Sequence, residues 1–118
     1  MDQLKKITIS FAIVFLINTI PLADDRHNVL IDVRTEEEFH KSHIPGAINV
    51  PLDIIHTRIE KIVNDTNGNI TLYCRSGRRS ELARNILTKL GYSNVTNGGS
   101  MTKVAKNYSR SETNNNNH

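Results

Sequence analysis

The sequence predicts an α/β protein with a small parallel sheet flanked by helices on both faces. Short runs rich in Val and Ile alternate along the chain with segments whose apolar residues recur at helical spacing. This alternation favours parallel strands joined by covering helices. A length of 118 residues allows one domain, and the single cysteine, Cys74, excludes a scaffold held by intramolecular disulfides.

The first 23 residues are expected to lie outside that domain. A segment with two lysines precedes an apolar run at 7–17, and Ala23 stands before an acidic pair. This order is typical of a secretory signal peptide, and the run is shorter than the roughly 20 residues of a spanning helix. Pro21 departs from the small residue usual at that point of a cleavage site. We therefore expect a signal peptide at 1–23; a retained anchor and a buried strand are the alternatives.

Local signals in the first half of the domain predict two strands and two helices. Residues 29–33 form a β-branched run typical of a buried strand, and Thr35 begins a short helix because Glu38 completes a capping box. A second short strand at 47–50 follows a Pro-Gly turn. The second helix starts at Asp53 and shows its core face in an apolar stripe at Ile54, Ile55, Ile59, Ile62 and Val63.

The second half begins with a strand at 70–73 that runs directly into Cys74. A helix is expected from Ser80 to Gly91, and a last strand at 94–96. The chain beyond Ser109 is rich in Asn, so we predict a domain at 24–109 and a disordered polar tail at 110–118. The apolar face expected for the helix is formed by Leu82, Ala83, Ile86, Leu87 and Leu90.

The loop after the third strand predicts an anion-binding site. Its backbone N–H groups and the positive end of the next helix can surround an anion, and Gly77 gives the loop its backbone freedom. Arg75, Arg78 and Arg79 add charge and bidentate donors. These groups favour the thiolate and should lower the pKa of Cys74. We interpret Cys74 as a nucleophile that attacks a small anion. The alternative is a buried core cysteine, which does not explain the flanking arginines.

Charge and ligand types narrow the function further. A net charge of +3 is too small to indicate a nucleic-acid partner, but residues 24–73 carry 5 basic and 9 acidic side chains, whereas 74–110 carry 8 basic side chains and one acidic. This cationic half begins at the cysteine and suits an anionic substrate. One cysteine excludes the common zinc sites, and the His40–His43 pair lacks further ligands nearby. We expect neither a metal nor another cofactor.

Four segments, taken in order, resemble the rhodanese family of sulfurtransferases over about residues 29–100. Cys74, Gly77, Arg79 and Ser80 match the family's Cys-x-x-Gly-x-Arg-Ser loop. The other matches are the Asp-x-Arg element at Asp32 and Arg34, Glu38-Phe39 with the His-Ile-Pro-Gly-Ala segment at 43–47, and the glycine elements at 90–92 and 97–99. Size and leader are most similar to the single-domain periplasmic rhodaneses of phage-shock type.

The resemblance implies a rhodanese-like fold and an enzyme that transfers sulfane sulfur. Thiosulfate or a similar donor would give its sulfur to Cys74 as a persulfide, which passes it to cyanide or a thiol. Asp32 and Arg34 would support the loop, with an ion pair between Arg34 and Glu38, and His43 would be a structural turn residue. The substrate-binding residues implied are Arg75, Ser76, Gly77, Arg78, Arg79 and Ser80, with Arg79 on the donor's sulfonate.

Two positions depart from the family pattern, and they concern the packing of the C-terminal segment. Ser42 stands where Gly usually precedes the His, and Ser100 follows Gly-Gly where a bulky apolar residue is common, with no Trp after it.

The expected partners are a small anionic sulfur donor and a thiophilic acceptor, with no nucleic acid and no membrane after signal removal. We expect an exported, periplasmic monomer.

Two other functions compete with this interpretation. A cysteine-dependent phosphatase uses a similar loop but needs Cys-x5-Arg, and here Arg79 is one residue too close to Cys74. A non-enzymatic persulfide carrier or partner-binding module would keep the fold, although such modules often lose the cysteine.

Overall fold

The computed structural model describes residues 28–115, so the predicted signal peptide at 1–23 lies outside the described residues. Four strands form one parallel sheet in the order β2-β1-β3-β4. The strands are β1 (Val29–Asp32), β2 (Ile48–Asn49), β3 (Ile70–Cys74) and β4 (Val95–Ser100). The helices are α2 (Glu36–Lys41), α3 (Ile55–Ile62), α4 (Arg78–Lys89) and α5 (Met101–Asn115), with a 3₁₀ turn at Leu52–Ile54 before α3.

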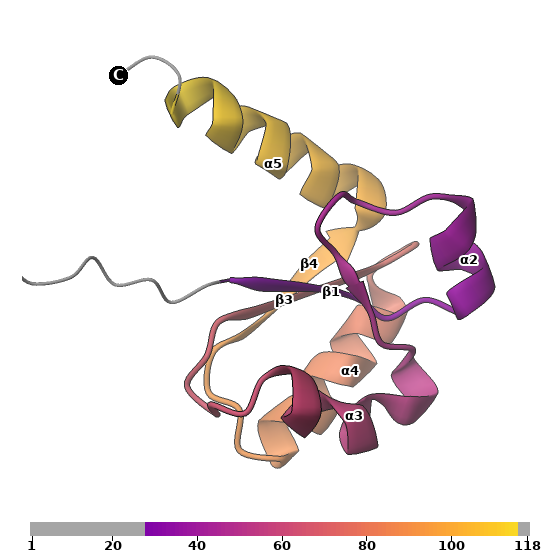
Figure 1. Cartoon of the computed structure of the whole chain (residues 1–118), viewed down its shortest axis with the longest axis vertical. Helices are drawn as coiled ribbons and strands as arrows, with labels where there is room; N and C mark the ends of the chain where they lie inside the picture. Colours follow the sequence, from indigo (N-terminus) through magenta and orange to yellow (C-terminus); the bar gives the residue numbers. More distant parts are fainter. Residues whose placement is uncertain (1–27, 116–118) are drawn as a thin grey trace, which may run out of the picture.

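Helices cover both faces of the sheet, which confirms the predicted fold class (Figure 1). Successive residues of a strand point to opposite faces, so β1 and β3 contribute to two separate cores. The larger core packs Ile31 and Leu72 against α3 and α4. The smaller core packs Leu30 and Tyr73 against Val104 of α5. The two central strands, β1 and β3, are therefore packed on both faces.

The carboxyl ends of β1 and β3 lie at the point where the chain changes direction through the sheet. From β1 the chain crosses to β2 on one side, and from β3 it crosses to β4 on the other. In open parallel sheets, such a switch point leaves a crevice in which ligands bind. Asp32 ends β1 and Cys74 ends β3, so both predicted residues lie at this point.

The C-terminal helix corrects the prediction of a disordered tail at 110–118 for residues 110–115, because α5 continues to Asn115. Its first turn is stabilised by the hydroxyl of Ser100, which accepts the N–H of Lys103 at 3.2 Å, and by burial of Val104. Residues 116–118 lie outside the described part of the chain. Within 28–115, no helix is long and apolar enough to cross a membrane.

The boundaries of most other elements differ by one to four residues from those predicted. The helix α4 begins at Arg78, and β4 extends to Ser100. The apolar face of α4 is also narrower than the pattern indicated. Ala83 and Leu87 are buried, but Leu82 and Leu90 are 48% and 47% exposed.

Candidate functional site

Cys74 lies at the base of the loop that joins β3 to α4. The residue is buried, and its Sγ accepts the backbone N–H of Gly77 at 3.0 Å. The hydroxyl oxygen of Ser80 lies 3.5 Å from the same sulfur. Burial raises the pKa of Cys74, but hydrogen bonds from the Ser80 hydroxyl and from loop N–H groups outweigh it, so the pKa falls below its ordinary value. The geometry therefore favours a thiolate, as the sequence predicted.

Glycine is required where the loop meets β4. Gly77 has φ +94°, in the left-handed region, and a Cβ on it would stand 3.3 Å from the Cα of Gly99. A Cβ on Gly98 would lie 2.7 Å from a methyl group of Val104. The strand register shifts here, because Leu72 pairs with Asn97 and Tyr73 pairs with Gly99. The Gly-Gly element thus lets β4 approach both the loop and α5.

Asn97 connects β4 to the loop, a role that the sequence analysis missed. Its Oδ1 lies 2.6 Å from the Ser80 hydroxyl, whose single proton is donated either to this oxygen or to Cys74 Sγ, and its Nδ2 donates to the carbonyl of Gly77 at 3.1 Å. The same Nδ2 also donates to the Glu81 carboxylate at 3.1 Å. Asn97 therefore fixes both residues that contact Cys74 Sγ. The signal in the sequence was a polar residue before Gly-Gly, but its partners depend on the register of β4.

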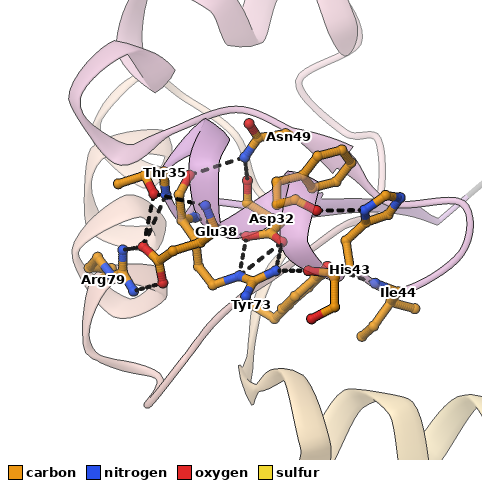
Figure 2. Close-up of polar contacts among 11 residues, drawn as sticks. Asp32, Thr35, Glu38, His43, Ile44, Asn49, Tyr73 and Arg79 are labelled. Atoms are coloured by element: carbon orange, nitrogen blue, oxygen red, sulfur yellow. Dashed lines mark hydrogen bonds and ion pairs between the residues drawn. The ribbon is translucent and has the colours of Figure 1, made fainter.

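Arg79 forms a bidentate ion pair with Glu38 across the gap between α4 and α2 (Figure 2). Glu38 also closes the capping box of α2 with Thr35, as predicted. The bond from Arg79 lowers the pKa of Glu38 to about 2. The two terminal nitrogens of Arg79, predicted to bind the donor's sulfonate, are thus occupied by a carboxylate.

The predicted ion pair between Arg34 and Glu38 is wrong. The guanidinium of Arg34 instead binds the buried carboxylate of Asp32, with Nη2 to Oδ2 at 2.7 Å. The same nitrogen donates to the carbonyl of Ser42 at 2.7 Å. Asp32 is the last residue of β1, and Arg34 follows two residues later, so the two side chains pair before α2 begins. Glu38 of α2 instead pairs with Arg79 of α4.

Hydrogen bonds of Asp32 and Arg34 therefore position α2 and the segment that follows it. The side chain of Asn49 donates to the carbonyls of both residues, at 3.1 and 3.0 Å (Figure 2). The hydroxyl of Tyr73 accepts the N–H of Ile44 at 3.1 Å, and burial raises the pKa of Tyr73 to about 12. These contacts hold the segment that carries Glu38, and through it they reach Arg79.

Three exposed residues around the loop, together with His43 in the segment after α2, are the remaining predicted residues of the site. Arg75, Ser76 and Arg78 are exposed, so their side chains are available to solutes. The ring of His43 stacks on Phe39 with centroids 3.7 Å apart, and its Nδ1 is bonded to the Phe39 carbonyl. This contact fits the structural role predicted for His43. Among residues 28–115, no group of three His, Cys, Asp or Glu gathers to hold a metal.

Both departures from the family pattern have local explanations. Ser42 has φ −166°, an extended conformation open to any residue, and it contributes its carbonyl to Arg34. Ser100 pairs with Cys74 in the sheet and caps α5 with its hydroxyl. Neither position therefore disturbs the loop.

The fold and the loop define a small α/β protein with a buried cysteine of lowered pKa at the base of an arginine-rich loop. The chain matches the Rhodanese-like domain over residues 21–106. It is 38% identical over 101 residues to the thiosulfate sulfurtransferase PspE of Escherichia coli, a match that covers 86% of this chain and 92% of that protein. The chain belongs to the rhodanese-like sulfurtransferase family.

Two further comparisons agree with this assignment. A sulfurtransferase of Allochromatium vinosum is 38% identical over 76 residues, which cover 64% of this chain and 69% of the relative. A solved structure described as a rhodanese with anions from E. coli superposes with a TM-score of 0.63 at 39% identity. That match covers 64% of this chain and 89% of the solved one. The resemblance seen in the sequence is thus confirmed at the level of family and fold.

Proposed function

We propose that this protein transfers sulfane sulfur from thiosulfate, or a similar donor, to cyanide or a thiol through a persulfide on Cys74. The observation that carries the proposal is the position of Cys74 Sγ, which accepts the Gly77 N–H at 3.0 Å inside a loop that lowers the pKa of the thiol. The relative PspE, which is named a thiosulfate sulfurtransferase, supports the same donor.

The transfer takes two displacements at sulfur. The Cys74 thiolate attacks the outer sulfur of thiosulfate, a new S–S bond forms, and the donor's own S–S bond breaks as sulfite leaves with the electron pair. The carbon of cyanide, or an acceptor thiolate, then attacks the outer sulfur of the persulfide. Cys74 leaves as a thiolate, so the enzyme returns to its starting state without an oxidant or a reductant.

The loop residues have distinct roles in this proposal. The N–H groups of Ser76 and Gly77 stabilise negative charge on the cysteine sulfur and on the persulfide. Arg75 and Arg78, both exposed, attract the anionic donor. Arg79 binds the donor's sulfonate only through its remaining nitrogen, or after its pair with Glu38 opens. Ser80 stabilises the thiolate by its backbone N–H, and by its hydroxyl when the O–H turns from Asn97 to the sulfur.

The competing functions make different predictions for the same assay. We expect thiocyanate from thiosulfate and cyanide with the wild-type protein, and none with Cys74→Ala. A phosphatase would instead hydrolyse p-nitrophenyl phosphate, and the loop places Arg79 one residue short of that pattern. A persulfide carrier would accept sulfur once without turnover. Turnover of Cys74→Ala at the wild-type rate would contradict the proposed mechanism.

We also propose export to the periplasm, with action there as a monomer on small molecules and without a cofactor. The basis is the order of a basic segment, an apolar run and Ala23 in the sequence. The mass of the protein isolated from a periplasmic fraction tests this proposal. Loss of residues 1–23 supports it, and an intact chain retained in the cytoplasm contradicts it.

A further inference from the structure

A lysine of α5 lies beside the cysteine loop although it is far from it in the sequence. A Cβ on Gly99 would stand 3.3 Å from Cδ of Lys103, so the aliphatic stem of Lys103 lies on Gly99. Gly99 is also the residue against which Gly77 of the loop packs. The chain of contacts therefore runs from Lys103 through one glycine to the turn that holds Cys74.

The backbone fixes this arrangement. Ser100 pairs with Cys74 in the sheet, and α5 follows β4 directly (Figure 1), so the helix begins one residue after the partner of the cysteine. The hydroxyl of Ser100 accepts the N–H of Lys103 at 3.2 Å, which sets the first turn of the helix. Gly99 has φ +90° and no side chain, so the lysine stem lies directly on the backbone residue that Gly77 of the loop contacts. Lys103 of α5 therefore lies near the loop although it is not part of the segment between β3 and α4.

Two arginines of α4 near the loop are already paired with carboxylates, whereas Lys103 is in none of the ion pairs found among residues 28–115. The guanidinium of Arg79 is paired with Glu38, and that of Arg84 is paired with Glu81. Lys103 is exposed, and a positive charge near the loop raises the local concentration of anions there. Lys103 can therefore supply positive charge that Arg79 does not.

We propose that Lys103 is a specificity-determining residue that favours anionic over neutral substrates at Cys74. This inference rests on the proposed function for its physiological meaning, but its physical content is a cationic field at the sulfur. Lys103 acts on the encounter with the anion and leaves the bond-making steps to the loop. Its removal should therefore raise KM and leave kcat nearly unchanged.

Alkylation of the single cysteine measures this field without sulfur transfer. The thiolate displaces iodide from iodoacetate, which is anionic, or from iodoacetamide, which is neutral, and the ratio of the two rates cancels the thiolate fraction. At low salt, Lys103→Met should lower the iodoacetate to iodoacetamide ratio by about two- to fivefold. Added salt of about 0.5 M should remove most of the difference. Lys103→Arg should keep the wild-type ratio.

Lys106→Met is the matched control, because Lys106 lies on the same helix and is exposed. An unchanged ratio in Lys103→Met, or an equal drop in Lys106→Met, would overturn the inference. With thiosulfate, Lys103→Met should raise KM by about three- to tenfold, since the donor carries two charges. If the wild-type protein does not turn over thiosulfate, the proposed function fails, and the alkylation ratio still decides the role of Lys103.

Discussion

Arg79 and Glu38 join the cysteine loop to α2 by two parallel hydrogen bonds, Nη1–Oε1 at 2.6 Å and Nη2–Oε2 at 3.0 Å. The pair comes from distant parts of the chain, and each side chain is about one-third exposed. Bidentate pairs of this kind are stronger than ordinary surface ion pairs. The pair therefore contributes to the position of the loop and to the stability of the fold.

Replacing Glu38 by Gln should destabilise the protein by about 1–2 kcal/mol at pH 7. The pKa of Glu38 in the folded protein, about 2, lies below its ordinary value of 4.5. The pair therefore stabilises fully above pH 4.5, and its contribution is lost as the pH falls through about 2. Urea denaturation followed by circular dichroism at several pH values measures the difference.

The matched control for that substitution is Glu37→Gln. Glu37 pairs with Lys41 on the same helix, but both side chains are about four-fifths exposed. Its loss should change the free energy of unfolding by less than about 0.5 kcal/mol. Equal effects of the two substitutions would show that the contact with Arg79 adds nothing.

Replacing Ser80 by Ala should raise the pKa of Cys74, because the hydroxyl that lies 3.5 Å from Sγ is lost. The thiolate fraction at pH 6 should then fall, and alkylation by iodoacetamide should slow by about three- to tenfold. The rate of alkylation measured against pH gives the shift directly. Ser76→Ala is the control, since Ser76 acts through its backbone N–H and should leave the curve in place.

Replacing Gly98 by Ala should destabilise the fold by about 2–4 kcal/mol. The new methyl group would meet Val104 at 2.7 Å and the carbonyl of Leu72 at 3.0 Å, so β4 and α5 would have to separate. Gly46→Ala provides the comparison, because Gly46 has φ +87° but nothing within 4 Å of a Cβ. It should cost about 1–2 kcal/mol from backbone strain alone. Thermal unfolding of both variants distinguishes collision from strain.

The sequence predicted the sheet and the cysteine loop because both depend on local signals. A β-branched run, a capping box and a glycine before an arginine-rich turn are visible without knowledge of the fold. The structure therefore confirms the strand at 70–73, which extends to Cys74, and a loop after it, which ends where α4 begins at Arg78. The covering helices followed from the spacing of residues such as Ile55 and Ile59, which the structure buries.

The parts that the sequence did not predict depend on contacts between distant residues. The role of Asn97 requires the register of β4 against β3, and the partner of Glu38 is set by where α4 begins. The helix α5 was missed because its polar, Asn-rich composition hides the two features that stabilise its start, the Ser100 cap and buried Val104. Composition reports average propensity, whereas single anchoring contacts decide such elements.

The central claim is that Cys74 carries the transferred sulfur, and intact-protein mass spectrometry tests it most directly. Incubation with thiosulfate, without an acceptor, should add about 32 Da, one sulfur atom, to the wild-type chain and nothing to Cys74→Ser. Cyanide added afterwards should remove this mass as thiocyanate forms. An unchanged mass of the wild-type protein in an assay that still forms thiocyanate, or the same gain in Cys74→Ser, would contradict the account.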